Sequence, residues 1–163
     1  MEYFLILPDS KVSKPLKFTA KEKQFLDKKP FVVNIGKLSD MVVVDIILMK
    51  FLFNSYFLLS EGLEKIFQTY VENIDTTPIL ITDDKYKLNL VYYVVDIEAT
   101  KDVVANKFLK LHDMQIREEL VKGIPIHKIY YEKQTYILVN RYVVESILRR
   151  FPAGIQFQEV KAI

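Results

Sequence analysis

The sequence predicts an α+β fold, with a mainly antiparallel or mixed sheet and two principal amphipathic helices packed against it. Short apolar runs of strand length recur along the chain, separated by Pro, Gly, Asn or Asp residues. Two other segments place apolar residues at helical spacing directly after a residue that caps helices well. The chain has 163 residues, of which 50% are hydrophobic. We therefore expect residues 1–163 to form a single globular domain.

The first third of the chain predicts three strands and one short helix. The strands are expected at residues 3–7, 31–35 and 41–49. Thr19 and Glu22 have the spacing of a capping box, and Phe25 and Leu26 follow as the apolar face of a helix. Pro30 would end that helix, because the residue before a proline avoids helical geometry.

The first principal helix, residues 61–71, is predicted to begin after Ser60. Ser60 follows the strand-like run 56–59, and its hydroxyl can accept from a free helix N–H. Apolar residues then follow the helical period, as on a buried face. They are Leu63, Ile66, Phe67, Tyr70 and Val71. A strand is expected to start at Pro78, and a long central strand at residues 86–96, whose second half is apolar on both faces.

The C-terminal third predicts a second copy of the same unit. A strand at 108–111, a helix from Asp113 to Val121 and a hairpin of strands 126–131 and 135–139 precede it. Asn140 then takes the place of Ser60, and helix 141–151 leads to a closing strand at 155–160. If one extra residue follows the second cap, the apolar residues of the second helix match those of the first. They are Val144, Ile147, Leu148 and Phe151, in the places of Leu63, Ile66, Phe67 and Tyr70. This repeat indicates either a pseudo-symmetric pair with a site between the halves, or reuse of a stable unit.

The composition excludes several classes of site. The chain has no cysteine, so disulfides, thiolate zinc sites, iron–sulfur clusters and a cysteine nucleophile are excluded, and a cytoplasmic location fits best. The net charge of +2 is too balanced to indicate nucleic-acid binding. The chain opens without the cationic and apolar segments of a signal peptide.

The most apolar run, residues 41–59, approaches the length of a membrane span. Asp45, Lys50 and Asn54 interrupt it, and a central charge costs about 2.5–3.5 kcal/mol in a spanning helix. The run is rich in Val, Ile and Phe, which favour strands. We therefore expect two consecutive core strands and no membrane partner.

No common catalytic motif occurs in the chain. A phosphate-binding loop, a nucleophile elbow, a paired-histidine zinc helix and a calcium loop are all missing. We therefore assign no catalytic, cofactor-binding or metal-binding residue and expect no cofactor. His112 and His127 are expected at the surface or its boundary, and His112 is not expected to face the adjacent Asp113.

Carboxylates occur in pairs, which we interpret as solvated groups. Asp83-Asp84 would lie in a turn, Glu118-Glu119 on an exposed helix face and Asp96 at the exit of a strand. An enzyme would instead require Asp96, Glu98 or His127 to converge in a concave pocket with shifted pKa values.

Ten tyrosines and no tryptophan are an unusual composition, and we expect several of these rings to be core or boundary residues. Tyr92-Tyr93 and Tyr130-Tyr131 lie in expected strands, where each pair points one ring to each face. Such rings suit a protein interface and also the stacking of nucleobases. The tight basic pairs Lys28-Lys29 and Arg149-Arg150 build no phosphate track, so nucleic acid is the less favoured partner.

The pattern of elements over roughly residues 45–160 resembles a bacterial protein family assigned as immunity proteins of polymorphic toxin systems. The matching features are a Ser-capped helix, a proline-led strand, a tyrosine-rich strand, a second strand before a helix, and a Gly-x-x-Phe-x-x-Val ending. In this chain they are Ser60 with 61–71, 78–81, 92–96, 136–139 and 154–160.

The resemblance implies a cytoplasmic protein that binds and neutralises a cognate toxin protein through a complementary surface, without chemistry of its own. A small hydrolase or transferase and a nucleic-acid-binding domain are the alternatives.

Overall fold

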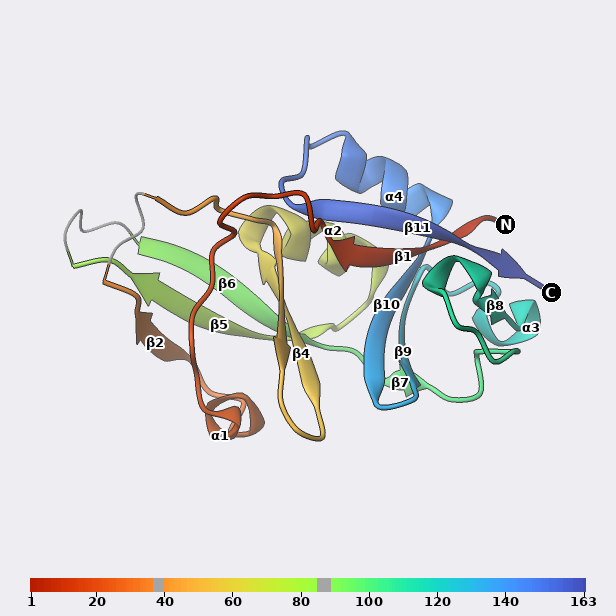
Figure 1. Cartoon of the computed structure of the whole chain (residues 1–163), viewed down its shortest axis with the longest axis horizontal. Coiled ribbons are helices and arrows are strands. Elements are labelled where there is room, and N and C mark those ends of the chain that lie inside the picture. Colours follow the sequence, from red (N-terminus) through yellow and green to blue (C-terminus); the bar gives the residue numbers. More distant parts are fainter. Residues whose placement is uncertain (37–39, 85–88) are drawn as a thin grey trace.

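Two mixed β-sheets frame an α+β fold (Figure 1). The computed structural model describes residues 1–36, 40–84 and 89–163. The five-stranded sheet, in the order β2-β5-β6-β4-β3, comprises β2 Phe31–Asn34, β3 Ile46–Lys50, β4 Ser55–Ser60, β5 Asp75–Thr82 and β6 Asn89–Asp96. The six-stranded sheet, in the order β7-β9-β10-β1-β11-β8, comprises β1 Tyr3–Pro8, β7 Ala99–Thr100, β8 Gln115–Ile116, β9 Ile126–Tyr131, β10 Gln134–Asn140 and β11 Ile155–Ala162. The predicted fold class is confirmed.

The two principal helices, α2 (Glu61–Tyr70) and α4 (Arg141–Leu148), join the sheets through one hydrophobic cluster. Its members include Ile6, Phe57, Phe67, Ile137 and Ile147. The helices also contact each other, because the Tyr70 hydroxyl donates to the Tyr142 carbonyl at 3.1 Å. The short helices α1 (Glu22–Leu26) and α3 (Glu118–Val121) contribute to two further clusters, which pack on the other faces of the sheets.

Both predicted caps are confirmed. The Ser60 side chain accepts from the Leu63 N–H at 3.4 Å, and the Asn140 side chain accepts from the Val143 N–H at 3.2 Å. The donor N–H lies three residues after the cap in both helices, so no extra residue follows the second cap, contrary to the prediction.

The two strand–helix–strand units share one topology. In each unit a parallel pair of strands is separated by one antiparallel strand. β6 fills the gap between β4 and β5, and β1 fills the gap between β10 and β11. β6 follows its unit directly in the chain, whereas β1 is the first element of the protein. The N-terminal strand therefore completes the C-terminal half.

The equivalence extends to individual ladder positions. Ser60 lies opposite Tyr92, and Asn140 lies opposite Tyr3. Both tyrosines are almost fully buried. The Tyr92 hydroxyl donates to the Val44 carbonyl at 2.5 Å, and burial raises the pKa of Tyr92 far above its usual value. Each helix cap is thus positioned beside a buried aromatic ring.

The predicted buried face of the second helix is partly wrong. Val143, Val144 and Ile147 are buried, whereas Leu148 and Phe151 are exposed. Leu148 lies on the exposed face of α4, and Phe151 lies beyond the end of the helix, in a turn where its φ is 50°. The alignment shifted by one residue had assigned these two side chains to the core.

Three predicted element boundaries also differ. The strand expected at 41–49 begins only at Ile46, and α1 is capped at Lys21 and not at Thr19. β5 begins at Asp75, so Pro78 lies inside it. This is tolerated because β2 pairs with β5 only from Ile79 onward, which leaves one side of Pro78 open. Of the strand expected at 86–96, residues 86–88 lie outside the described residues.

The segment between β7 and β9 was predicted poorly. The strand expected at 108–111 is not formed, and the helix expected from Asp113 to Val121 is replaced by three short elements. These are a 3-10 turn at Leu111–Asp113, β8 and α3. The buried side chains of Met114, Ile116 and Val121 pack in the cluster on the outer face of the six-stranded sheet. Tertiary packing therefore overrides the local helical pattern here.

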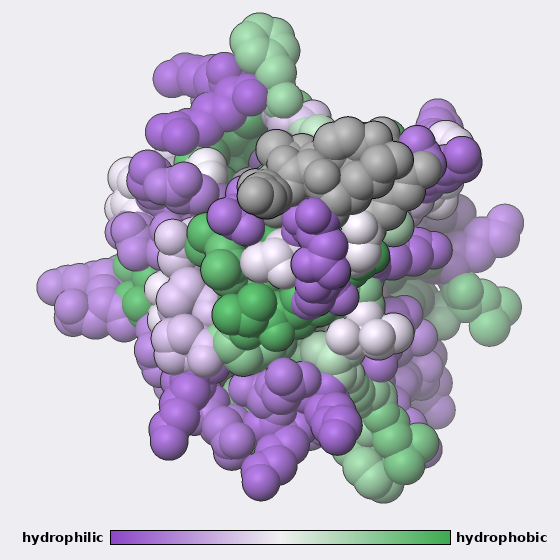
Figure 2. Space-filling view, turned by 90° about the vertical axis from the view of Figure 1, so that its left-hand side faces the viewer, coloured by the Kyte–Doolittle hydropathy of each residue, from purple (hydrophilic) through white to green (hydrophobic). Residues whose placement is uncertain are grey.

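The apolar run 41–59 folds as strands, as predicted, and contributes β3 and β4. Among the described residues, no helix has the length and apolar character that a membrane crossing requires. The end of the molecule viewed in Figure 2 is mostly hydrophilic around a small apolar patch.

Asp45 links the first unit to the second. Its carboxylate accepts from the Ser60 hydroxyl at 2.5 Å and from the Ala153 N–H at 2.6 Å. Its backbone N–H donates to the Ala153 carbonyl at 2.8 Å. Because Ala153 lies between α4 and β11, this one residue holds the cap of α2 against the loop of the other half.

We expect Asp45→Ala to lower the free energy of unfolding by about 1–3 kcal/mol, because it leaves the Ser60 hydroxyl and the Ala153 N–H without an acceptor. Urea unfolding measures the loss. Asp27→Ala, at an exposed position with no side-chain hydrogen bond in the described structure, is the control and should change stability by less than about 0.5 kcal/mol. Equal losses for the two variants would contradict the linking role of Asp45.

Candidate functional site

A cleft separates the hairpin β3–β4 of one sheet from the hairpin β9–β10 of the other. It has two lobes, with volumes of about 470 Å³ and 820 Å³, and we call it the inter-sheet cleft. Ser55, Phe57 and Thr135 line both lobes. The two hairpins therefore form the shared wall between a first lobe on the side of α1 and β6, and a second lobe on the side of β1 and β3.

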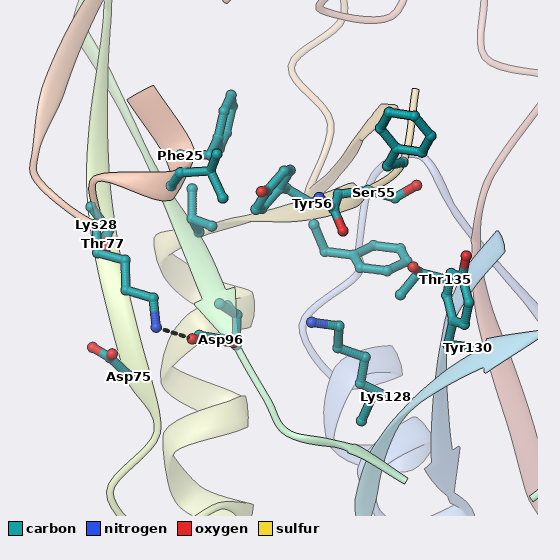
Figure 3. A pocket seen from close by; sticks show the side chains of 17 residues that line it. Phe25, Lys28, Ser55, Tyr56, Asp75, Thr77, Asp96, Lys128, Tyr130 and Thr135 are labelled. Atoms are coloured by element: carbon teal, nitrogen blue, oxygen red, sulfur yellow. Dashed lines mark hydrogen bonds and ion pairs between the residues drawn. The ribbon is translucent and has the colours of Figure 1, made fainter. Parts of the chain in front are cut away.

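An aromatic cluster forms one wall of the first lobe. The rings of Phe25 and Tyr56 stack with centroids 4.9 Å apart, and Phe51 lies 5.6 Å from Phe25. This cluster fixes α1 to the hairpin β3–β4, as Figure 3 shows for the labelled Phe25 and Tyr56. Burial, and after it the nearby Glu22 carboxylate, raises the pKa of Tyr56. Tyr56 is therefore a neutral wall residue at physiological pH.

Charged side chains stand on both sides of the first lobe (Figure 3). Lys28 donates to Asp96 at 2.5 Å, and this hydrogen bond is the main reason that the pKa of Lys28 is raised. Lys128 extends into the lobe from β9 on the opposite wall. Within the described residues Lys128 forms no ion pair. The lobe thus carries the Lys28–Asp96 pair, the exposed Asp75 carboxylate on the same side and the Lys128 ammonium group on the opposite wall.

The rim of the first lobe carries large apolar side chains that water reaches. Leu26 is 59% exposed, Phe53 76% and Tyr130 53%. Leu52, next to Phe53 at the tip of the β3–β4 hairpin, is 83% exposed. Isolated exposed apolar residues are normal, but a group around a concave surface is typical of an interaction site.

The second lobe lies between the edge of β3 and the hairpin β9–β10. Leu48 and Lys50 border it from β3, and Glu132, Lys133 and the start of β10 border it from the other side. The Phe108 and Tyr131 rings stack at 5.0 Å beside it, and the adjacent Leu109 is fully exposed.

The tip of the β9–β10 hairpin is conformationally strained. Glu132 and Lys133 form the two-residue loop, with φ values of 47° and 65°. Such loops normally contain Asn and Gly, since other residues resist a positive φ. Strain of this kind occurs often at binding sites, and here it lies at the border of the second lobe.

The structure does not bring the candidate enzyme residues together. His127 is 2% exposed, contrary to the expectation of a surface or boundary position. Its Nδ1 lies 3.1 Å from the Thr100 hydroxyl, and its Nε2 lies 3.2 Å from the Val121 carbonyl. Asp96 is instead paired with Lys28, and Glu98 is exposed. No imidazole and carboxylate converge in the described part of the cleft.

The predicted exposure of the remaining carboxylates and of His112 is confirmed for some residues and wrong for Asp83. Asp84 is exposed and accepts from Asn34 at 2.7 Å, but Asp83 is buried, which corrects its assignment as solvated. His112 is exposed, as expected, yet its Nε2 lies 3.4 Å from Asp113 because both belong to the tight 3-10 turn. Glu118 and Glu119 are not buried, as expected for a solvated helix face. Among the described residues, no group of three His, Asp or Glu side chains could hold a metal ion.

The tyrosine pairs divide between the two faces of their strands, as predicted. Tyr92 is buried while Tyr93 is half-buried, and Tyr130 is exposed in the first lobe while Tyr131 borders the second. Sequence reasoning missed Lys28, Lys128 and the hairpin residue Phe53 as cleft residues. The period of two places Lys128 beside Tyr130, but nothing in the sequence shows that α1 and β6 lie opposite them.

No protein-family model matches the chain, and a search of curated proteins also finds no match. The resemblance to immunity proteins therefore stays a prediction.

We expect Lys133→Gly to raise the free energy of unfolding by about 0.5–1 kcal/mol, because glycine adopts a positive φ without steric cost. Lys128→Gly is the matched control: it also removes a lysine, but at an ordinary strand position, so it should destabilise the protein. Thermal unfolding of both variants measures the difference. A loss of stability in Lys133→Gly would show that the turn is not strained.

The burial of His127 lowers its pKa, and this predicts a pH-dependent stability. Below about pH 6.5 the unfolded chain binds a proton at this residue while the folded chain does not, so stability falls as the pH decreases through that value. His127→Gln keeps a polar side chain that does not titrate, and its urea-unfolding curve at pH 8 and at pH 5 serves as the comparison. The wild type should lose more stability than the variant between these two conditions, and equal losses would contradict the prediction.

Proposed function

We propose that the protein binds another protein through the mouth of the inter-sheet cleft and performs no chemistry there. The observation that carries this proposal is a group of exposed apolar side chains at a concave surface that Lys128 also lines: Leu26, Phe53 and Tyr130, with Leu52 next to Phe53. Exposed aromatic anchors beside a pocket are the usual energetic centre of a protein interface. The absence of a converging acid and base among the described residues gives an enzyme no comparable support.

The partner that best fits the sequence is a cognate bacterial toxin, as the resemblance to immunity proteins implies. The protein would act in the cytoplasm, where it would bind the toxin and neutralise it by protein–protein contact. An inhibitor of this kind needs shape and charge complementarity only, which a rigid cleft wall and a free ammonium group supply. The packed rings of Phe25, Phe51 and Tyr56 hold α1 against the β3–β4 hairpin, and the exposed Leu26 and Phe53 belong to these two elements.

We expect Phe53→Ala to weaken partner binding at least about tenfold, because the side chain is a large exposed anchor at the rim. The control is Phe151→Ala, which removes another largely exposed phenylalanine, after α4 and outside both lobes of the cleft. Tagged wild-type protein first captures its partner from cells of the source organism, and calorimetry with the purified partner then compares the three proteins.

The partner must also be toxic when expressed alone, and the wild type must relieve that toxicity better than Phe53→Ala. A stoichiometric partner whose affinity is the same for Phe53→Ala and wild type would place the interface elsewhere. A partner that is harmless by itself would contradict the immunity role.

A further inference from the structure

The outer edge of β3 has no strand partner. β3 is the last strand in the order of its sheet and pairs with β4 alone. The backbone N–H of Ser60 donates to the Asp45 carbonyl, and the backbone N–H of Phe51 donates to the Asn54 carbonyl. In an antiparallel pair these hydrogen bonds recur at every second residue, so Ile46, Leu48 and Lys50 direct their N–H and C=O groups away from β4. This edge therefore holds unpaired backbone donors and acceptors.

Only the second half of that edge is open. Ahead of the strand, Val42 exchanges hydrogen bonds with Lys14 and Leu16, so another segment occupies that side of the chain. At Leu48 and Lys50 no described segment pairs with the edge, and both residues border the second lobe of about 820 Å³. The free backbone groups thus face a groove and not flat surface.

Other strand edges in the described structure suit a partner less well. β7 and β8, at the two edges of the six-stranded sheet, are two residues long. β2, at the far edge of the five-stranded sheet, lines neither lobe of the cleft. β3 is the edge strand that combines length with an adjoining groove.

The charges of the second lobe favour an acidic occupant. Lys50 and Lys133 line it, and neither forms an ion pair within the described residues. Glu132 is the acidic residue in the lining, and it contacts the Tyr131 hydroxyl. The exposed Leu109 and the stacked Phe108 and Tyr131 rings provide apolar contact area on the other side.

We propose that an extended acidic segment of the partner protein adds to β3 as a further strand of the five-stranded sheet and lies in the second lobe. Strand addition satisfies the free backbone groups of Leu48 and Lys50 and gives affinity that depends little on side chains. Lys50 and Lys133 then select acidic residues along the segment. This inference rests on the proposed function, because the added segment is part of the protein that binds at the cleft.

The probe is a capped peptide of about eight residues that alternates valine and glutamate, compared with one that alternates valine and lysine. Amide chemical shifts and hydrogen exchange of the wild-type protein are recorded during titration. We expect shifts and new protection at Leu48 and Lys50, with about tenfold tighter binding of the acidic peptide. Shifts confined to other amides, equal binding of both peptides, or no shift at about 1 mM peptide would overturn the proposal.

Two variants of one exposed residue separate backbone pairing from charge. Lys50→Pro removes an N–H that points away from β4, so the β3–β4 ladder stays intact while strand addition is blocked. Lys50→Gln removes the charge alone. We expect no peptide binding to Lys50→Pro and weaker, still localised binding to Lys50→Gln. Wild-type affinity in a folded Lys50→Pro would overturn the proposal.

Phe53→Ala should bind the peptide as the wild type does, because it alters the first lobe. If the acidic peptide does not bind at β3 but toxin binding still depends on Phe53, the strand-addition proposal is wrong and the proposed function stands. If the peptide binds as expected but no toxin depends on Phe53, the edge of β3 is a peptide site and the proposed function is wrong.

Discussion

The insertion of β1 between β10 and β11 is the constraint on which the rest of the structure depends. These two strands belong to one strand–helix–strand unit, and they do not touch each other in the ladder. Only the N-terminal strand supplies the hydrogen bonds that join them, with Ile6 in the shared core and Leu5 in the outer one. The C-terminal half therefore cannot form its sheet until the first residues of the chain return to it, which makes the fold dominated by long-range contacts.

The cleft is a consequence of this arrangement. Each half keeps its helix on the side facing the other half, so α2 and α4 meet and the two sheets are held at a fixed separation. The two lobes of the cleft lie between the hairpins β3–β4 and β9–β10, and core residues such as Phe57 line them. The β3–β4 hairpin, with the exposed Leu52 and Phe53 at its tip, then faces the β9–β10 hairpin, with the charged Glu132 and Lys133 at its tip, across a groove. In the binding role that we propose, a preorganised surface of this kind would lose less conformational entropy on association than a flexible one.

Local rules predicted the parts of the fold that depend on neighbours in sequence. Ser60 and Asn140 cap their helices because a cap needs only an oxygen within reach of an N–H three residues ahead. The exposure of Leu148 and Phe151 was missed because the second unit was aligned one residue out of register with the first, and because α4 ends before Phe151. His127 was misplaced for a similar reason, since the segment containing Thr100 and Val121 covers it from a distance in sequence. The cleft itself was not predicted, because Lys28, Asp96 and Lys128 come from three distant segments.

By itself, the sequence determined the α+β class, the two capped helices, the strands around them and the exclusion of cysteine chemistry. These follow from periodicity, capping and composition, which act over a few residues. Only the tertiary structure decided that β1 completes the second half, that β3 keeps an open edge, and that two lobes separate the hairpins. The physical reason is that strand pairing is made by backbone groups, which are nearly the same in every residue, so the local pattern of one strand does not by itself show which partner lies beside it.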